Sequence, residues 1–418
     1  TPMTTARTEP TPPPRPGPRP LALHLTLASG TWLGALGALP LALNGAIPWR
    51  PELAARAKTL TESLATSDAA RAADALAVEI GDRHADLVAG IRGYRAHPYR
   101  RRVAEPPVVW RQGTTRLLDY GAVNRAADGA SVLFVPSLVN RAYILDLAPR
   151  RSLMRYLSRR GIRPFLLDWG DPGGEERGFD LTKYMVARLR PALEAACAHG
   201  GGSVGLVGYC MGGLLALALA LQCPRSVTSL ALLATPWDFH ADNPAAPILG
   251  AAGAALPAAG VMPVDLLQSF FALADPLAVA AKFRAFAALA PDSTRARAFV
   301  QIEDWLNDGV PLAAPAAREC LIGWYGENRP ARGTWRVAGR PVRPAALTVP
   351  ALVVIPARDR IVPMASAEAL AGAIGNPETL RPAAGHIGMV VGRRARAGLW
   401  RPLAAWLCDH GKRHRPGT

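Results

Sequence analysis

The stretch GLVGYCMGG, residues 205–213, decides the fold of this chain. The apolar residues that lead into it predict a buried strand, and the Ala/Leu-rich residues 214–221 that follow predict a helix. Glycine stands two positions before and two positions after Cys210, where a sharp strand-to-helix turn leaves no room for a Cβ atom. Free N–H groups at the helix start favour a thiolate. The stretch therefore predicts a nucleophilic Cys210, with an ordinary buried cysteine as the alternative.

Length and composition indicate a globular protein. The chain has 418 residues, 50% hydrophobic and 19% charged, and its net charge of +16 comes almost entirely from arginine. The arginines are scattered and no nucleic-acid motif accompanies them, so we expect no nucleic-acid partner and attribute part of the charge to a phosphate-bearing ligand. The five cysteines show neither a metal-binding spacing nor a disulfide framework. A reducing compartment, no metal and no cofactor are therefore expected.

The N-terminal region differs from the rest of the chain. Residues 1–20 are rich in Pro, Thr and Arg and predict a disordered tail. Residues 21–49 (Leu21 to Trp49) carry no charged side chain, and three interpretations stay open: a signal peptide, a transmembrane helix, or a hydrophobic segment that packs on the protein, a partner or an apolar particle. We favour the third, because Pro40 interrupts the run; membrane contact stays open. Helical spacing covers residues 51–93, and the basic residues 94–102, which include Pro98, are expected to link this region to the main domain.

Strands and helices alternate beyond this region. Two short apolar segments around Gly113 predict a β-hairpin, and the pattern that follows predicts an α/β fold with a mostly parallel sheet covered by helices on both faces. A helix over residues 182–199 is expected to kink at Pro191. After the tail, the chain is expected to consist of a helical N-terminal region (21–103), a catalytic core (104–241 and 343–411) and a helical cap insertion (242–342).

Two further residues complete a catalytic pattern. A cysteine needs a base to form thiolate at neutral pH, and the base needs an acid to orient it. Asp359 follows the predicted strand 349–356, and His386 lies between two glycines further along the chain. Nucleophile, acid and histidine follow in the order of α/β hydrolases. Asp359 as a helix cap and His386 as a structural histidine are the alternatives, and Asp238, after another predicted strand, is the reserve acid.

The same chemistry needs two N–H groups that stabilise the oxyanion of a tetrahedral intermediate. The first is expected from Met211, directly after the nucleophile. The second is expected from the loop after the predicted strand 131–136, where we choose Val139. Both are backbone roles, so any side chain could stand at these positions.

These motifs resemble the polyhydroxyalkanoate synthases. The segment GYCMGG is similar to the lipase-like box of that family, in which cysteine replaces the usual serine. Other segments resemble the family in the same order, and the resemblance covers residues 106–407, nearer the short type that works with a second subunit. These segments are VNRAYILDL (139–147), DWG (168–170), DRIVP (359–363) and GHIG (385–388).

The resemblance implies an α/β-hydrolase fold and an acyltransferase. Cys210 would attack the thioester of an (R)-3-hydroxyacyl-CoA and release CoA, which makes the CoA thioester a substrate and requires no cofactor. His386 would deprotonate Cys210 and then the 3-hydroxyl of the incoming unit, and Asp359 would orient His386. In some mechanisms of the family, the residue that corresponds to Asp359 activates that hydroxyl itself. The product would be a polyester, which places the protein in the cytoplasm at a granule surface. A second synthase subunit or a homodimer is the implied protein partner.

Two other function classes stay open. The first is a cysteine α/β hydrolase that acts as an esterase, a thioesterase or a polyester depolymerase. Serine is the commoner nucleophile for hydrolysis, and this favours transfer. The second is a catalytically silent binder of granules or membranes, anchored by residues 21–49. The intact order of the three catalytic candidates argues against that binder.

Overall fold

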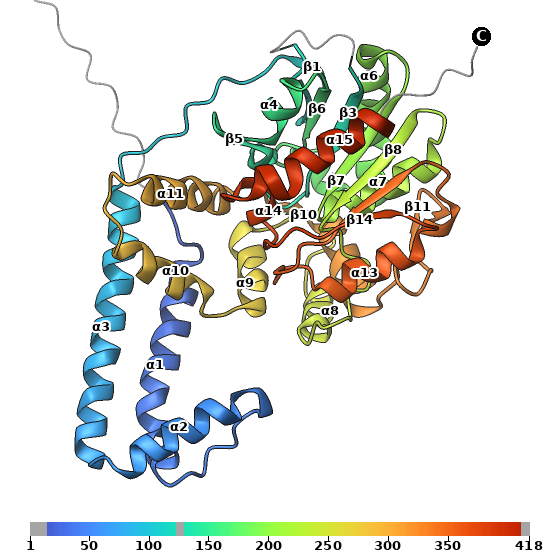
Figure 1. Ribbon diagram of the computed structural model, residues 1–418. Helices are drawn as coiled ribbons and strands as arrows, with labels where there is room; N and C mark the ends of the chain where they lie inside the picture. The colour runs from blue at the N-terminus through green and yellow to red at the C-terminus, as the bar shows by residue number, and fades with distance from the viewer. Residues whose placement is uncertain (1–14, 123–128, 411–418) are drawn as a thin grey trace, which may run out of the picture. The chain divides into compact units, whose positions relative to one another are not determined.

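The computed structural model describes residues 15–122 and 129–410. They divide into two compact units, and Figure 1 colours the chain by residue number, from blue at the N-terminus to red at the C-terminus. The catalytic unit runs from Arg101 to Asp275 and resumes at Asp308, whereas the N-terminal unit takes the described residues up to Arg100 and also Pro276–Asn307. The cap insertion expected at 242–342 is thus shared between the two units.

An eight-stranded sheet forms the centre of the catalytic unit (Figure 1). The strand order is β1-β2-β6-β3-β7-β8-β13-β14; β1, β2 and β6 pair antiparallel, and every pair from β6 to β14 is parallel. This confirms the predicted hairpin and the mostly parallel sheet. The strands are β1 (Val108–Gln112), β2 (Thr115–Asp119), β3 (Ser131–Val135), β6 (Arg163–Asp168), β7 (Val204–Tyr209), β8 (Val227–Leu233), β13 (Ala351–Val354) and β14 (Glu378–Leu380).

The inner strands are buried along their whole length. Every residue of β3, β7 and β8 is buried, because helices cover both faces of the sheet. This explains why these strands are continuous apolar runs without alternation. α6 packs against β3, α7 packs against β7 and β8, and α15 packs against β8. The helices are α4 (Leu153–Ser158), α5 (Leu181–Tyr184), α6 (Arg190–Gly200), α7 (Met211–Gln222), α13 (Met364–Ala373), α14 (Gly388–Val391) and α15 (Arg401–His410).

Two π-helical segments each end two residues before a proline. The predicted helix over 182–199 consists of α5, the π-helical segment η4 (Met185–Leu189) and α6, whose second residue is Pro191. The segment η7 (Arg396–Trp400) precedes Pro402 in the same way. Proline lacks an N–H group and its ring crowds the preceding turn, and a widened turn relieves that crowding. The expected kink at Pro191 therefore takes the form of a π-helical turn.

Further elements of the catalytic unit lie between β8 and β13. α8 (Ala246–Ala254) and the π-helical segment η5 (Glu319–Gly326) approach closely, since a Cβ atom on Gly250 would lie 2.5 Å from the Cα atom of Gly326. The other elements of the unit are β9 (Val261–Met262), α9 (Val264–Ala274), β10 (Leu312–Ala313), α12 (Ala314–Arg318), β11 (Arg336–Val337), β12 (Arg340–Pro341) and η6 (Pro344–Ala346), with η2 (Ala142–Leu145), β4 (Asp146–Ala148), β5 (Arg151–Ser152) and η3 (Glu176–Gly178) earlier in the chain.

The N-terminal unit is helical and has its own core. Trp32, Tyr94 and Phe283 belong to one buried apolar cluster. The first part of the predicted tail lies outside the described residues, but Arg15 is buried and its Nε atom lies 2.6 Å from an oxygen of Asp304. The helices are α1 (Leu21–Leu43), η1 (Pro51–Leu53), α2 (Ala54–Ala65), α3 (Ala69–Ala96), α10 (Ala278–Ala287) and α11 (Thr294–Asn307).

α1 is apolar but mostly uncovered. Among the described residues it is a helix long and apolar enough to cross a membrane, although only 11% of its most apolar window is buried. Ala28 and Trp32 pack into the core of the N-terminal unit, whereas Leu33 is 54% exposed. α1 therefore packs on its own protein along one side only.

Candidate active site

Cys210 occupies the turn between β7 and α7. Its φ angle of +55° and ψ angle of −129° lie in a backbone region that residues other than glycine rarely adopt. A Cβ atom on Gly212 would lie 2.2 Å from the carbonyl oxygen of Val135, and one on Gly208 would lie 2.3 Å from the Cα atom of Gly213. The glycines on both sides of the cysteine are therefore required by close backbone approach.

Asp359 and His386 form a buried pair. The Nδ1 atom of His386 lies 2.7 Å from Oδ2 of Asp359, and the two side chains are 7% and 1% exposed. The other carboxylate oxygen, Oδ1, accepts the N–H groups of Ile361 and Val362 over 2.8 and 3.0 Å. These bonds fix the carboxylate, and the carboxylate in turn fixes the orientation and the tautomer of the ring.

Cys210 also interacts with the imidazole ring of His386. Burial lowers the pKa of His386, but the negative charges of Cys210 and Asp359, together with hydrogen bonds to both, raise the pKa to about 10. Such a pKa favours an imidazolium at position 386 at neutral pH. The structure thus brings Cys210, Asp359 and His386 into one interacting group.

Asp238 does not join this group. Its Oδ1 atom accepts the amide of Asn328 over 2.8 Å and the backbone N–H groups of His240 and Ala241 over 3.0 and 3.1 Å. Within the described residues, Asp359 is the carboxylate that hydrogen-bonds to His386. The reserve candidate for the acid therefore lines the pocket and stabilises its own loop there.

The two backbone N–H groups expected for the oxyanion lie at the same pocket. Met211 is the first residue of α7, where N–H groups have no partner within the helix. The N–H group of Val139 points to Oγ of Ser137 over a long 3.5 Å, a bond that a stronger acceptor could replace. Met211, Val139 and Cys210 all line one cavity.

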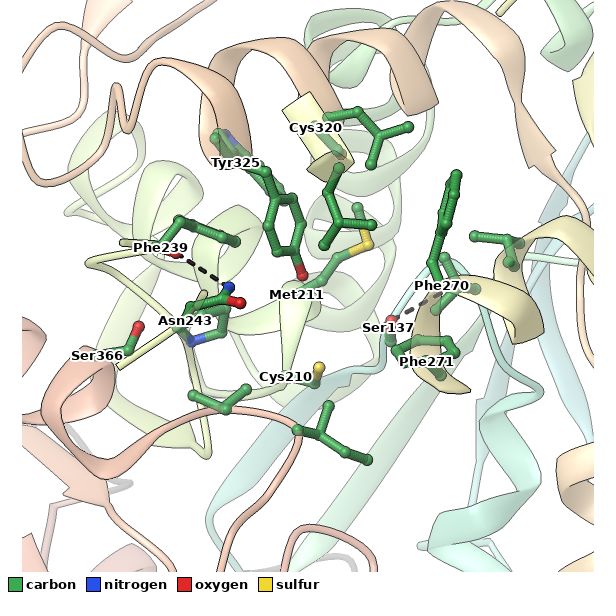
Figure 2. A pocket seen from close by; sticks show the side chains of 18 of the residues that line it. Ser137, Cys210, Met211, Phe239, Asn243, Phe270, Phe271, Cys320, Tyr325 and Ser366 are labelled. Carbon is green, nitrogen blue, oxygen red and sulfur yellow. Dashed lines mark hydrogen bonds between the residues drawn. The ribbon is translucent and has the colours of Figure 1, made fainter. Parts of the chain in front are cut away.

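That cavity is a mostly apolar hollow of about 120 Å³ (Figure 2). Figure 2 shows Tyr325 directed into it, with Phe270 and Phe271 on the side away from Asn243. Such a lining keeps water away from an intermediate at Cys210. The apolar lining residues are Val139, Met211, Pro236, Phe239, Leu249, Met262, Leu267, Phe270, Phe271, Leu312, Ala317, Leu321, Trp324, Ile361, Val362 and Pro363.

Two pocket residues were missed by the sequence analysis. Burial first, and then the charges of Cys210 and Cys320, raise the pKa of Tyr325, so its hydroxyl stays protonated inside the pocket. Burial also raises the pKa of the Cys320 thiol, which lines the same pocket. Both residues come from η5, more than a hundred positions after the nucleophile. No local sequence pattern links them to Cys210.

Two known families match this chain. The family described as "alpha/beta hydrolase fold" matches residues 131–257, the range from β3 to α8 and beyond. The family described as "Poly-beta-hydroxybutyrate polymerase (PhaC) N-terminus" matches residues 66–157. The first match confirms the predicted fold class, since it contains the nucleophile turn and the centre of the sheet.

Curated relatives agree with these families. The chain is 28% identical to the poly(3-hydroxyalkanoate) polymerase subunit PhaC of Haloferax mediterranei, over 73% of this chain and 64% of that protein, which is less than two thirds of its length. Subunits of the same description from Synechocystis sp. and Allochromatium vinosum are 29% and 28% identical, over 66% and 67% of this chain and 77% and 81% of theirs. In structure, the chain is similar to an esterase from Thermogutta terrifontis, with 18% identity, a TM-score of 0.45, and coverage of 74% of this chain and 99% of that one. Together with the motifs, these matches show that the chain is similar to the polyhydroxyalkanoate synthases, short-type subunits among them, and that it has an α/β-hydrolase fold.

Proposed function

We propose that this protein polymerises (R)-3-hydroxyacyl-CoA into polyhydroxyalkanoate through a covalent acyl-cysteine at Cys210. The observation that carries the proposal is the 2.7 Å contact between His386 and Asp359, in a site where Cys210 raises the pKa of the same histidine. The family and the polymerase subunits named above support the substrate class. CoA thioester is the substrate, and the residues described for the site supply the reacting groups themselves.

In the first half-reaction, the Cys210 sulfur attacks the carbonyl carbon of the thioester. The N–H groups of Met211 and Val139 stabilise the oxyanion of the tetrahedral intermediate. The intermediate then breaks its bond to the CoA sulfur, and His386 gives that sulfur the proton it holds. The products are an acyl-Cys210 thioester and free CoA.

In the second half-reaction, neutral His386 removes the proton from the 3-hydroxyl of the incoming hydroxyacyl-CoA. The oxygen attacks the acyl-Cys210 carbonyl, an ester bond forms, and the cysteine leaves as a thiolate beside the imidazolium. The lengthened chain, now a CoA thioester, returns to Cys210 by the first half-reaction. The free-energy change for moving an acyl group from one thiol to another is close to zero. The acyl-enzyme is therefore still a thioester that reacts with the next alcohol.

The apolar pocket supports transfer over hydrolysis. Water that reached the acyl-Cys210 would release a free hydroxy acid and end the chain. The aromatic and aliphatic residues around Cys210 form the lining, and the polar residues among them are few. A hydrolase would instead need a route for water to the same carbonyl carbon.

The test is turnover of purified protein with (R)-3-hydroxybutyryl-CoA. Free CoA is followed with a thiol reagent and the product is sized by chromatography, with and without an added synthase subunit. We expect CoA release with polymer, abolished by Cys210→Ala and retained by Cys320→Ala. Cys320 is the matched control, because it is a second cysteine of the same pocket.

The other outcomes separate the remaining functions. Release of 3-hydroxybutyrate without polymer would replace the proposal with a cysteine hydrolase. CoA release that Cys210→Ala leaves unchanged would exclude the acyl-cysteine. The absence of any release, with the second subunit supplied, would indicate a silent binder.

We also propose that the protein works in the cytoplasm at the polyester granule, with α1 as the contact segment. The exposed apolar side chains of α1, Leu33 and Leu41, support this. Leu33→Asn with Leu41→Asn should lower the fraction of protein that sediments with purified granules, whereas Leu53→Asn with Val78→Asn, exposed outside α1, should not. Flotation with lipid vesicles but not with granules would favour a membrane segment. Light scattering of the same samples distinguishes a monomer, a homodimer and a complex with a second subunit.

A further inference from the structure

An arginine-rich hollow lies in the catalytic unit apart from the Cys210 pocket. It measures about 620 Å³ and shares none of its lining residues with that pocket. Five of its ten lining residues are arginine, and none is acidic. We call it the arginine hollow. The lining residues are Pro149, Arg150, Arg151, Tyr156, Arg159, Val391, Gly392, Arg393, Arg396 and Trp400.

Several arginines elsewhere in the unit form ion pairs with carboxylates. Another hollow, of about 390 Å³, holds arginines and acids together: Arg116 lies 2.6 Å from Asp168, and Arg141 lies 3.2 Å from Asp308. The arginine hollow differs. Across residues 15–122 and 129–410, no ion pair is found for four of its five arginines, namely Arg150, Arg159, Arg393 and Arg396.

Two buried aromatic side chains contribute to the lining of the arginine hollow. Tyr156 and Trp400 are 4% and 6% exposed and their ring centroids lie 5.4 Å apart. The indole N–H of Trp400 donates to the carbonyl oxygen of Val390 over 2.9 Å. The guanidinium groups of Arg160 and Arg396 each lie 5.4 Å from the Tyr156 ring, so two positive charges are held on one buried side chain.

Like charges gathered around one hollow repel one another, and a bound anion would remove that cost. The planar guanidinium group matches the geometry of phosphate oxygens and can bind them in pairs. A hollow lined by several such groups suits more than one phosphate, and its volume is within the ~300–1,000 Å³ typical of small-molecule sites. We propose that the arginine hollow binds the phosphate groups of a small polyphosphorylated ligand.

Two sources share this chemistry: the phosphate-bearing half of CoA and a free oligophosphate. The site is adjacent in sequence to the active site, because α14 begins two residues after His386 and ends at Val391, a lining residue. Phosphate binding can be measured without turnover, so its result does not depend on whether the protein carries out the acyl transfer proposed above.

The test is calorimetric titration of the full-length Cys210→Ala protein with inorganic tripolyphosphate, CoA and pantetheine. We expect tripolyphosphate to bind and pantetheine, which has no phosphate, not to compete. Arg150→Gln with Arg393→Gln should weaken tripolyphosphate binding about tenfold, a change of ~1.4 kcal/mol. Displacement of tripolyphosphate by CoA identifies CoA as the source; binding without that competition identifies a free oligophosphate.

Two control pairs separate a built site from general charge. Arg56→Gln with Arg71→Gln removes the same charge from exposed positions of α2 and α3 and should leave the affinity unchanged. Arg150→Lys with Arg393→Lys keeps the positive charge but loses the paired N–H donors of the guanidinium group. Its affinity for tripolyphosphate should lie between those of the wild type and the Arg150→Gln, Arg393→Gln variant. Equal weakening by both glutamine pairs, no binding of tripolyphosphate, or binding to anionic vesicles alone would overturn the proposal.

Discussion

The ring of Tyr209 lies against the imidazole of His386, with centroids 5.1 Å apart and planes 28° from parallel. The Tyr209 hydroxyl also donates to the backbone carbonyl of His386 over 3.2 Å. Burial, and then the charges of Cys210 and Asp359, hold the pKa of Tyr209 well above its usual value, so the hydroxyl stays a donor. The residue before the nucleophile thus holds the histidine by its ring and by its backbone.

Two substitutions at Tyr209 separate these contacts. Tyr209→Phe keeps the stacked ring and leaves a buried carbonyl without its donor, which should lower the free energy of unfolding by ~1–3 kcal/mol. Tyr209→Leu also removes the ring, and should lower kcat more than Tyr209→Phe with little change in KM. Urea unfolding and steady-state CoA release measure the two effects. Equal kcat values for the two variants would show that the stack does not position His386.

Asp359→Asn should slow CoA release by about 10²–10⁴-fold, because an amide cannot stabilise the imidazolium and favours the wrong tautomer. Asp238→Asn is the matched control, since this carboxylate accepts from Asn328 and from backbone N–H groups. It should leave the rate within a few-fold of wild type. A comparable loss in the Asp238 variant, with Asp359→Asn active, would make Asp238 the acid.

The stability should depend on pH through His386. Its pKa is raised from 6.5 to about 10, so the folded protein binds this proton more tightly than the unfolded chain. The resulting stabilisation is fully present below pH 6.5 and is lost as the pH rises through 10. Asp359→Asn removes one cause of the shift, so the gap in unfolding free energy between wild type and this variant should narrow from pH 6.5 to 10. Denaturant unfolding across this range measures the gap, and a constant gap would contradict the assignment.

Gly212→Ala should destabilise the protein by ~1–3 kcal/mol or more, because the new Cβ atom would lie 2.2 Å from the Val135 carbonyl oxygen. Gly372→Ala, inside α13, is the control, since no atom lies within 4 Å of that Cβ position. Alanine is the better helix former there by up to ~1 kcal/mol, so this variant should be as stable as wild type or more so. Thermal unfolding distinguishes the two, and similar melting temperatures would show that the nucleophile turn can open.

The sequence was informative where function and fold share one local pattern. The turn at Cys210 needs glycine on both sides, and the strand before it is apolar because both faces are covered, so both features are readable from a few neighbouring residues. Helical spacing in residues 242–342 indicated helices but not the surface that each one covers. Phe283 of α10 has the same spacing whether it packs on a sheet or, as observed, on Tyr94 with ring centroids 5.6 Å apart. Tyr325 was missed for a related reason, since only the tertiary fold brings it to the cysteine.

The backbone at position 210 has a consequence for the whole molecule. Glycine adopts a φ angle of +55° without penalty, whereas a residue with a side chain is held there at a cost of ~1–3 kcal/mol. Cys210→Gly should therefore yield an inert protein that resists unfolding better than the active one. Catalytic activity and the free energy of unfolding are therefore opposed at this one residue. A homologue that no longer needs the activity would become more stable by replacing this cysteine with glycine.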